Sequence, residues 1–128
     1  MNNNKNPKPT EAELKILQIL WQNGPSSVRF VNDKLNEEKE VGYTTTLKIM
    51  QIMADKELVN RNTENRTHIY ESFIEEDATQ KQLLKKFVDA TFRGSAMKLV
   101  MQALGNHEAS EDELEKIKEL IKKIESEK

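Results

Sequence analysis

Apolar residues recur every three or four positions in the first part of the chain, which predicts two helices there. Residues 10–13, Thr-Glu-Ala-Glu, form a capping box, in which the threonine hydroxyl accepts from a backbone amide and Glu13 reaches back to the cap. Gly24 and Pro25 predict the end of the first helix, because glycine permits a left-handed cap and proline cannot continue a helix. Ser26 is the predicted N-cap of the second helix. The residues expected to face inward are Leu14, Ile16, Leu17, Ile19, Leu20, Trp21, Val28, Val31 and Leu35.

A third helix is predicted from Thr44, and two short β-like runs follow it. The runs are residues 58–62 and 67–73, and the polar residues 63–66 between them are typical of a turn, so the pair is predicted to form a hairpin. Three helices followed by a hairpin is the order of a winged helix-turn-helix domain, although an unrelated α+β arrangement has the same order. The inward face of the third helix is expected to carry Thr46, Ile49, Met50 and Met53.

Only helical patterns follow from Ile74 onward. Capping boxes at Ser72 and Ser110 predict the starts of a long helix and of a final helix, and Ser95 is expected to begin a shorter helix between them. The long helix is expected to end near Gly94. The predicted fold class is mainly α with a small β-hairpin wing, in which a winged helix-turn-helix domain is followed by a helical dimerisation domain.

The apolar stripes of these last helices are narrow and flanked by Lys and Glu, so each needs a partner surface. Three short helices cannot easily cover one another's apolar faces, whereas two copies of the chain can interlock. We therefore expect a homodimer; the alternative is a monomeric helical subdomain folded back on the first domain. The residues expected in the dimer interface are Leu83, Phe87, Leu99, Val100, Leu114, Ile117, Leu120, Ile121 and Ile124.

Composition agrees with a chain that needs a partner. Of its 128 residues, 36% are apolar and 33% are charged, which allows only a small core in one subunit. The predicted parts are a disordered tail, residues 1–8, a winged-helix DNA-binding domain, residues 9–73, and the helical dimerisation domain, residues 74–128. Residues 1–73 contain 10 basic and 10 acidic side chains, so a DNA-binding face requires that the fold gather the positive charges locally.

Several kinds of chemistry are excluded or disfavoured. The chain has no cysteine, which excludes disulfides, thiolate chemistry and Cys-based metal sites. The four glycines are isolated, so there is no glycine-rich phosphate loop. His68 and His107 are the only conventional bases, and both lie in polar segments. We expect neither enzymatic activity nor a cofactor, and because no apolar run is long enough to span a membrane we expect a cytoplasmic protein.

The polar face of the third helix and the tip of the hairpin form the candidate DNA-binding surface. A recognition helix presents its N-terminal residues to base edges, where threonine, lysine and glutamine bond to bases or phosphates; any amphipathic helix also has a polar face. Arg66, at the hairpin tip, suits a phosphate or minor-groove contact, and its alternative is an ordinary turn residue. Lys56 and Arg61 are either phosphate contacts or plain surface residues, and Tyr70 is expected to pack inward. The candidate DNA contacts are Tyr43, Thr44, Thr45, Lys48, Gln51 and Arg66.

Three segments together resemble the penicillinase repressor (BlaI/MecI/CopY) family. Residues 10–21, Thr-Glu-Ala-Glu-Leu-Lys-Ile-Leu-Gln-Ile-Leu-Trp, are similar to its opening helix. Residues 43–53, Tyr-Thr-Thr-Thr-Leu-Lys-Ile-Met-Gln-Ile-Met, are similar to its recognition helix. Residues 55–59, Asp-Lys-Glu-Leu-Val, followed by Asn-Arg at 65–66 and by Tyr70, are similar to its strand and wing. The segments occur in the family's order, and the resemblance extends over nearly the whole chain.

The resemblance implies a homodimeric winged-helix repressor that binds a palindromic operator in double-stranded DNA and dimerises through its C-terminal helices. In the best-known members a membrane-bound sensor metalloprotease detects a β-lactam, and cleavage of the repressor in its dimerisation region releases the DNA. The repressor itself is not expected to insert into the membrane. Two other functions stay open: a winged-helix protein-interaction adaptor, and a repressor released by a small molecule bound directly in a cleft between the domains.

The chain departs from the family's pattern at several positions. The family often has Arg where this chain has Ile52 and Gly where it has Glu57, which is expected to remove a polar contact and to alter the turn into the wing. Members with a mapped cleavage site are cut at an Asn-Phe pair, and the matching residues here are Gln102 and Ala103, so the protease step has a different specificity or is absent. The copper-responsive branch carries a Cys-rich C-terminal motif, and the absence of cysteine excludes copper sensing by that route.

Overall fold

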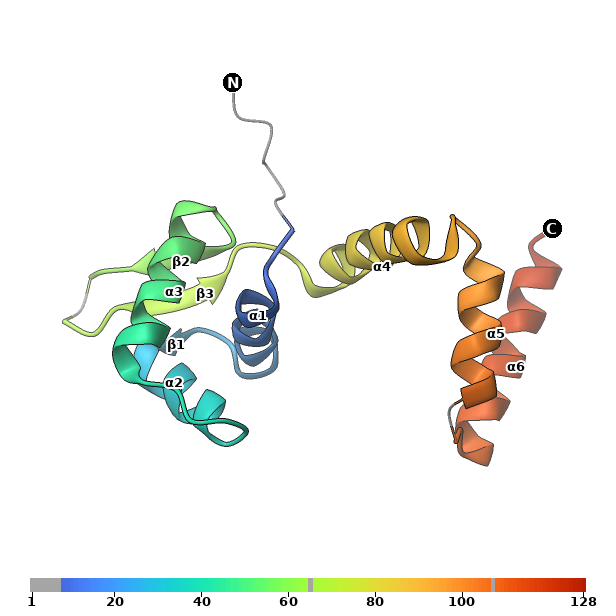
Figure 1. Ribbon diagram of the computed structural model, residues 1–128, viewed down its shortest axis with the longest axis horizontal. Helices are drawn as coiled ribbons and strands as arrows, with labels where there is room; N and C mark the ends of the chain where they lie inside the picture. Colours follow the sequence, from blue (N-terminus) through green and yellow to red (C-terminus); the bar gives the residue numbers. More distant parts are fainter. Residues whose placement is uncertain (1–7, 65, 107) are drawn as a thin grey trace, which may run out of the picture. The chain divides into compact units, whose positions relative to one another are not determined.

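The computed structural model describes residues 8–64, 66–106 and 108–128, and the chain divides after Leu83 into two compact units. The predicted disordered tail lies outside the described residues except for Lys8, and so do Asn65 and His107. In chain order, the elements in Figure 1 are α1 (Glu11–Asn23), β1 (Ser26–Ser27), α2 (Val28–Asn36), α3 (Tyr43–Asp55), β2 (Val59–Asn62), β3 (Ile69–Ser72), α4 (Glu76–Phe92), α5 (Ala96–Asn106) and α6 (Glu111–Ser126).

Helix α1 begins and ends as predicted. Thr10 Oγ1 accepts from the Glu13 amide at 3.1 Å, and Glu13 Oε1 accepts from the Thr10 amide at 2.9 Å, so both halves of the capping box are present. Gly24 follows the helix with φ 80°, in the left-handed region that favours glycine, and its N–H donates to the Leu20 carbonyl. The helix buries Ile16, Leu17 and Leu20.

Helix α2 is capped one residue later than expected. Ser27, not Ser26, is its N-cap, because Ser27 Oγ accepts from the Phe30 amide at 3.1 Å. Ser26 instead lies in β1, pairs with Tyr70 of β3 and donates from its Oγ to the Gly24 carbonyl at 2.8 Å. The prediction of Ser26 as the cap was wrong because a two-residue strand has no periodicity, and only pairing across the sheet identifies it.

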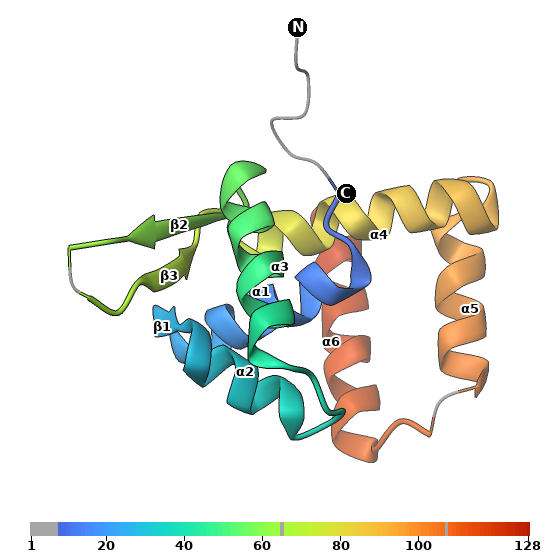
Figure 2. The same cartoon turned by 60° about the vertical axis from the view of Figure 1, so that its left-hand side comes forward.

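The predicted hairpin is confirmed, and among the described residues it forms part of a three-stranded antiparallel sheet in the order β1-β3-β2. Strands β2 and β3 pair from Val59 opposite Ser72 to Asn62 opposite Ile69, so both are slightly shorter than the predicted runs. Figure 2 shows β2 and β3 extending past α3 as a wing. Three helices with this wing make a winged helix-turn-helix domain, as the order of the elements predicted.

One hydrophobic core joins α1, α2 and α3 to the sheet. Trp21, which we expected inside it, lies half-buried at its edge, where Nε1 donates to Ser72 Oγ at 2.9 Å and to the Ile74 carbonyl at 3.1 Å. Tyr70 packs inward as predicted and is fully buried. The buried core residues are Ile16, Leu17, Leu20, Val28, Val31, Met50, Met53, Leu58, Val59 and Tyr70.

Ser72 does not cap the long helix, so this predicted capping box is wrong. Its Oγ donates to the Ile74 carbonyl at 2.6 Å and accepts from Trp21, which leaves the hydroxyl engaged at the end of β3, while α4 begins only at Glu76. The first turns of α4 belong to the first compact unit, and Thr79 there is buried. The first compact unit ends at Leu83, whereas the predicted boundary between the DNA-binding and dimerisation domains is residue 73.

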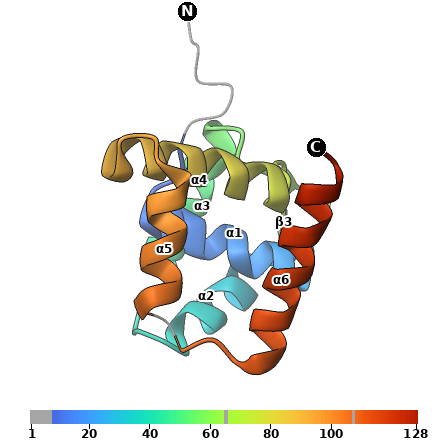
Figure 3. The ribbon, with the colours of Figure 1, turned by 90° about the vertical axis from the view of Figure 1, so that its right-hand side faces the viewer.

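The second unit consists of the end of α4 with α5 and α6. Helix α4 ends at Phe92, close to the predicted end near Gly94, whose φ is 82° and whose N–H donates to the Val88 carbonyl at 3.0 Å. The capping box at Ser110 is present, with Oγ accepting from the Glu113 amide at 3.1 Å. Helices α5 and α6 run in opposite directions (Figure 3), and none of their described residues is buried. Within the described part of the chain, no helix is long and apolar enough to cross a membrane.

Tyr70→Phe is expected to leave the free energy of unfolding unchanged or to raise it by about 1 kcal/mol. The ring is fully buried, but Tyr70 Oη has no hydrogen-bond partner among the described residues, so the hydroxyl is desolvated without a compensating bond. Tyr70→Ala should lower the same free energy by about 3–5 kcal/mol because it leaves a cavity. Urea unfolding followed by circular dichroism measures both variants. A loss above about 1 kcal/mol in the phenylalanine variant would show that the hydroxyl is bonded in solution.

Candidate nucleic-acid interface

Helix α3 has a buried face and an exposed face. Thr46, Met50 and Met53 are buried in the core, and Ile49 packs against it, as predicted. The opposite face is exposed and carries the residues of this helix that are predicted to contact DNA. An exposed polar helix face beside a wing is the geometry of a recognition helix. These exposed residues are Tyr43, Thr44, Thr45, Lys48 and Gln51.

Two asparagines of α2 hold the start of α3. Asn32 Nδ2 donates to the Val41 carbonyl at 3.0 Å and to Thr46 Oγ1 at 2.8 Å. Asn36 bonds to both backbone groups of Val41, each at 3.0 Å. These bonds satisfy polar groups of the turn before α3, whose N-cap Gly42 provides no side-chain bond. They tie α2 to the start of α3, and the sequence did not predict them because the partners lie in different elements.

The end of α3 is held by an ion pair with a buried carboxylate. Glu13 is only 3% exposed, and its Oε2 lies 2.8 Å from Nζ of Lys56, the C-cap of α3. Its Oε1 accepts from the Thr10 amide, so the carboxylate is both paired and hydrogen-bonded, as a buried charge must be. From the sequence, Glu13 was expected only in the capping box, and Lys56 was expected to be a phosphate contact or a surface residue. In the structure Lys56 ties the end of α3 to the start of α1.

Glu57→Gly is expected to raise the free energy of unfolding by about 1 kcal/mol. Glu57 stands between α3 and the wing with φ 63°, in the left-handed region where a side chain is strained and glycine is not. Thermal or urea unfolding measures the gain. Glu57→Ala is the matched control, because it removes the charge and keeps the Cβ. An equal gain in the alanine variant would assign the effect to charge rather than to the backbone.

Helix α3, the start of α2 and the wing loop line one open groove of about 580 Å³. Its described lining residues include two guanidinium groups, those of Arg29 and Arg66, and no carboxylate. The fold therefore gathers two positive charges beside α3, although the charges of this half of the chain balance. The lining residues are Ser27, Val28, Arg29, Tyr43, Leu47, Gln51, Arg66, Thr67 and His68.

Arg29 stacks on the aromatic ring of Tyr43 in this groove. Its guanidinium carbon lies 5.4 Å from the ring centroid, which is the geometry of a cation–π contact. The contact restrains an exposed arginine near the start of α2, where a helix-turn-helix domain crosses the DNA backbone. Sequence analysis did not single out Arg29, because only the fold brings it beside Tyr43. The one signal in the sequence that could have pointed to Arg29 is its place as a basic residue soon after a predicted N-cap.

The structure brings together three of the six predicted DNA contacts. Tyr43, Gln51 and Arg66 line the groove with Arg29. Thr44 and Lys48 are exposed on α3 but do not line it, and they lie on the helix surface next to it. Thr45 lines a different groove, between α1 and α3. His68, which sequence analysis considered only as a base, lies in the first groove with the two arginines.

The helices predicted to dimerise expose many apolar side chains. Phe87 of α4 is 50% exposed and packs edge-on against Phe92, with ring centroids 5.8 Å apart. Of the other residues predicted for the interface, Leu83, Leu99 and Ile117 are partly exposed, and the rest are more exposed. Gln102 and Ala103, the residues at the predicted cleavage position, are exposed within α5. Exposed large apolar residues from α4 onward are Leu84, Phe87, Met97, Val100, Met101, Leu104, Leu114, Leu120, Ile121 and Ile124.

Comparison with known proteins gives consistent matches along the chain. The family model described as penicillinase repressor matches residues 9–123. The methicillin resistance regulatory protein MecI of Staphylococcus aureus is 22% identical over 120 residues, covering 94% of this chain and 98% of that protein. The penicillinase repressor of Bacillus licheniformis is 20% identical over 117 residues, covering 91% of each chain. The transcriptional regulator BlaI of Mycobacterium tuberculosis is 31% identical over 61 residues, covering 47% of this chain and 44% of that one.

A solved structure shares the fold. The structure of RosR from H. salinarum has a TM-score of 0.51 and 16% sequence identity, and the match covers 95% of this chain and 98% of that chain. At this level of identity the likeness concerns the fold alone. It agrees with the winged helix-turn-helix arrangement described above and extends into the C-terminal helices.

Proposed function

The chain belongs to the penicillinase repressor family, and from this membership we propose that it is a transcriptional repressor that binds a palindromic DNA operator as a homodimer. The observation that carries the proposal is the groove beside α3. There, Arg29 and Arg66 line the groove together with Tyr43 and Gln51, and the described lining residues include no carboxylate. Guanidinium groups suit phosphate oxygens, and glutamine can pair with adenine in the major groove.

The homodimer is proposed from the apolar faces of the C-terminal helices. Helices α5 and α6 bury none of their described residues within one chain, so their apolar side chains need a partner surface. A second copy provides the same faces with two-fold symmetry, and two symmetric recognition helices read a palindrome. Two linked domains also gain effective concentration on adjacent half-sites, so dimerisation contributes to affinity without any new DNA contact.

We further propose that a membrane-bound sensor metalloprotease releases the repressor by cutting the dimerisation region, as in a β-lactam-type response. Gln102 and Ala103 lie in α5 and are exposed in the single chain, which favours their access to a protease. Cleavage there separates α6, which carries five of the nine predicted interface residues, from the DNA-binding unit. The two half-sites then bind independently, and the affinity gained through dimerisation is lost.

Selection from a library of random double-stranded DNA tests the proposed DNA binding without knowledge of the operator. We expect the purified protein to enrich one motif with two inverted half-sites, spaced by about one helical turn or a multiple of it. Enrichment of a single half-site would contradict binding as a dimer. Failure to enrich any motif, with retention of folded protein, would favour the protein-interaction adaptor instead.

A further inference from the structure

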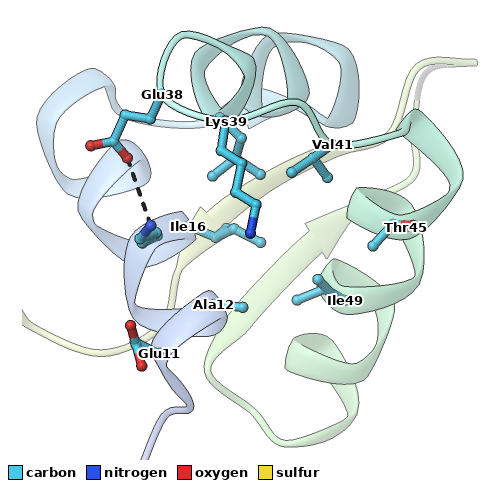
Figure 4. A pocket seen from close by; sticks show the side chains of 10 residues that line it. Glu11, Ala12, Ile16, Glu38, Lys39, Val41, Thr45 and Ile49 are labelled. Carbon is cyan, nitrogen blue, oxygen red and sulfur yellow. Dashed lines mark ion pairs between the residues drawn. The ribbon is translucent and has the colours of Figure 1, made fainter.

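A second groove in the first unit lies between α1, the end of α2 and α3, with a volume of about 310 Å³. Figure 4 shows Ala12, Ile16, Val41 and Ile49 around it, and Leu35 completes its apolar lining. Ile16 is fully buried and forms part of the core, whereas the other four are accessible to different degrees. An apolar concavity of this size lies at the lower end of the range for small-molecule sites.

Two carboxylates and two ammonium groups line this groove, so its formal charges balance, but one ion pair alone forms among these described residues. Lys15 Nζ lies 3.8 Å from Glu38 Oε2, and both side chains are exposed. Lys39 forms no ion pair with any residue that the structure describes, and Figure 4 shows its side chain reaching across the groove. Glu11, the remaining charged residue of the lining, lies on the outer side of α1 in this view, away from the Lys39 ammonium group. An unpaired cation therefore stands over an apolar surface.

We propose that this groove binds a small organic anion with an apolar body, whose charged group pairs with the Lys39 ammonium. A volume of 310 Å³ holds about ten groups the size of a water molecule, which matches a carboxylate with a chain of about eight carbons. The apolar chain would cover Ala12, Val41 and Ile49, and the carboxylate would replace water around the lysine. A cationic amphiphile of the same length would place a positive group against Lys39, so we expect it to bind more weakly.

The position of the groove links such a ligand to the recognition helix. Thr45 and Ile49 belong to α3, and Val41 lies in the turn that the asparagines of α2 hold. A ligand that fits one orientation of α3 better than another shifts the balance between them. Occupation is therefore expected to change operator affinity, and this part of the inference rests on the proposed function. The site lies within the DNA-binding unit, not in a cleft between domains.

Titration of the full chain with octanoate, followed by methyl NMR, tests the site without DNA. We expect saturable shifts of the Ile49 and Val41 methyl groups, with a dissociation constant on the order of 0.1–1 mM for a ligand of about ten heavy atoms. Lys39→Gln should weaken binding at least about threefold, since it removes the charge partner. Lys81→Gln, which changes an exposed lysine of α4 that does not line the groove, should leave binding unchanged.

Two further measurements test the charge preference and the location of the site. Octylamine should bind at least about threefold more weakly than octanoate to the unaltered protein. Ala12→Leu should abolish octanoate binding, because Ala12 is exposed on α1 and a leucine there fills the groove while preserving helix propensity. No saturable shift, equal binding of octylamine, or unchanged binding in the Lys39 variant would overturn the site. If the site holds but octanoate leaves operator affinity unchanged, the link to DNA fails and the proposed function stands.

Discussion

Replacing Ile117 and Ile121 together by aspartate should convert the dimer into monomers and weaken operator binding about a hundredfold or more. Both residues lie on the apolar stripe of α6, where Ile117 is partly exposed and Ile121 is 51% exposed in the single chain. A second copy would bury them, and a buried carboxylate without a partner is far more costly than an exposed one. The linked half-site binding that a dimer provides would then be lost.

Sedimentation velocity at micromolar protein and fluorescence anisotropy on the selected operator measure these two effects. Lys118→Asn with Lys122→Asn is the matched control: it changes the net charge by the same amount, on side chains of α6 that are exposed. The control should remain dimeric, and circular dichroism checks that both variants are folded. Sedimentation of the unaltered protein as a monomer, or of the aspartate variant as a dimer, would reject the proposed interface.

Arg66→Ala should weaken operator binding about tenfold and reduce the salt dependence of binding by about two units of slope, one for each half-site. Arg66 lies in the wing loop and lines the groove beside α3, where a guanidinium can neutralise one phosphate of each half-site. Lys48→Ala should act in the same direction if its ammonium also meets a phosphate. Gln51→Ala should weaken binding by about 1–3 kcal/mol and leave the slope unchanged, because a base contact releases no counterion.

Anisotropy titrations at several salt concentrations separate these contributions. Lys81→Ala serves as the reference, since it removes one positive charge from an exposed position of α4 that does not line the groove. Thermal unfolding checks that each variant retains its stability. Unchanged affinity in the Lys48, Gln51 and Arg66 variants together would reject the assignment of the DNA-binding face.

Local physical chemistry explains which predictions from the sequence were confirmed. The capping boxes at Thr10 and Ser110, the glycines at 24 and 94 and the periodicity of the helices each depend on residues within a few positions of one another. The hairpin followed from two β-like runs around a polar turn. Interactions between residues so close in the chain form wherever the segment lies in the fold. The order of the elements, and from it the fold class, could therefore be predicted.

The two wrong predictions share a different cause. Ser26 and Ser72 have the composition of helix caps, and each is instead engaged by a partner from another element: Ser26 pairs with Tyr70, and Ser72 accepts from Trp21. A serine serves as a helix cap only when pairing or bonding to another segment does not compete for its backbone or its hydroxyl. That competition arises between segments that are far apart in the chain, so local patterns do not report it.

The same distinction between local and long-range interactions applies to the candidate site. The sequence by itself determined which residues of α3 are polar, that an arginine stands in the wing loop, and that the C-terminal helices carry apolar stripes. Only the tertiary structure placed Arg29 over Tyr43 at 5.4 Å, paired Lys56 with the buried Glu13 at 2.8 Å, and separated Thr45 from the other candidates. The physical reason is that periodicity and capping act over one or two turns, whereas the electrostatics of a groove depend on charges that packing brings together from several elements.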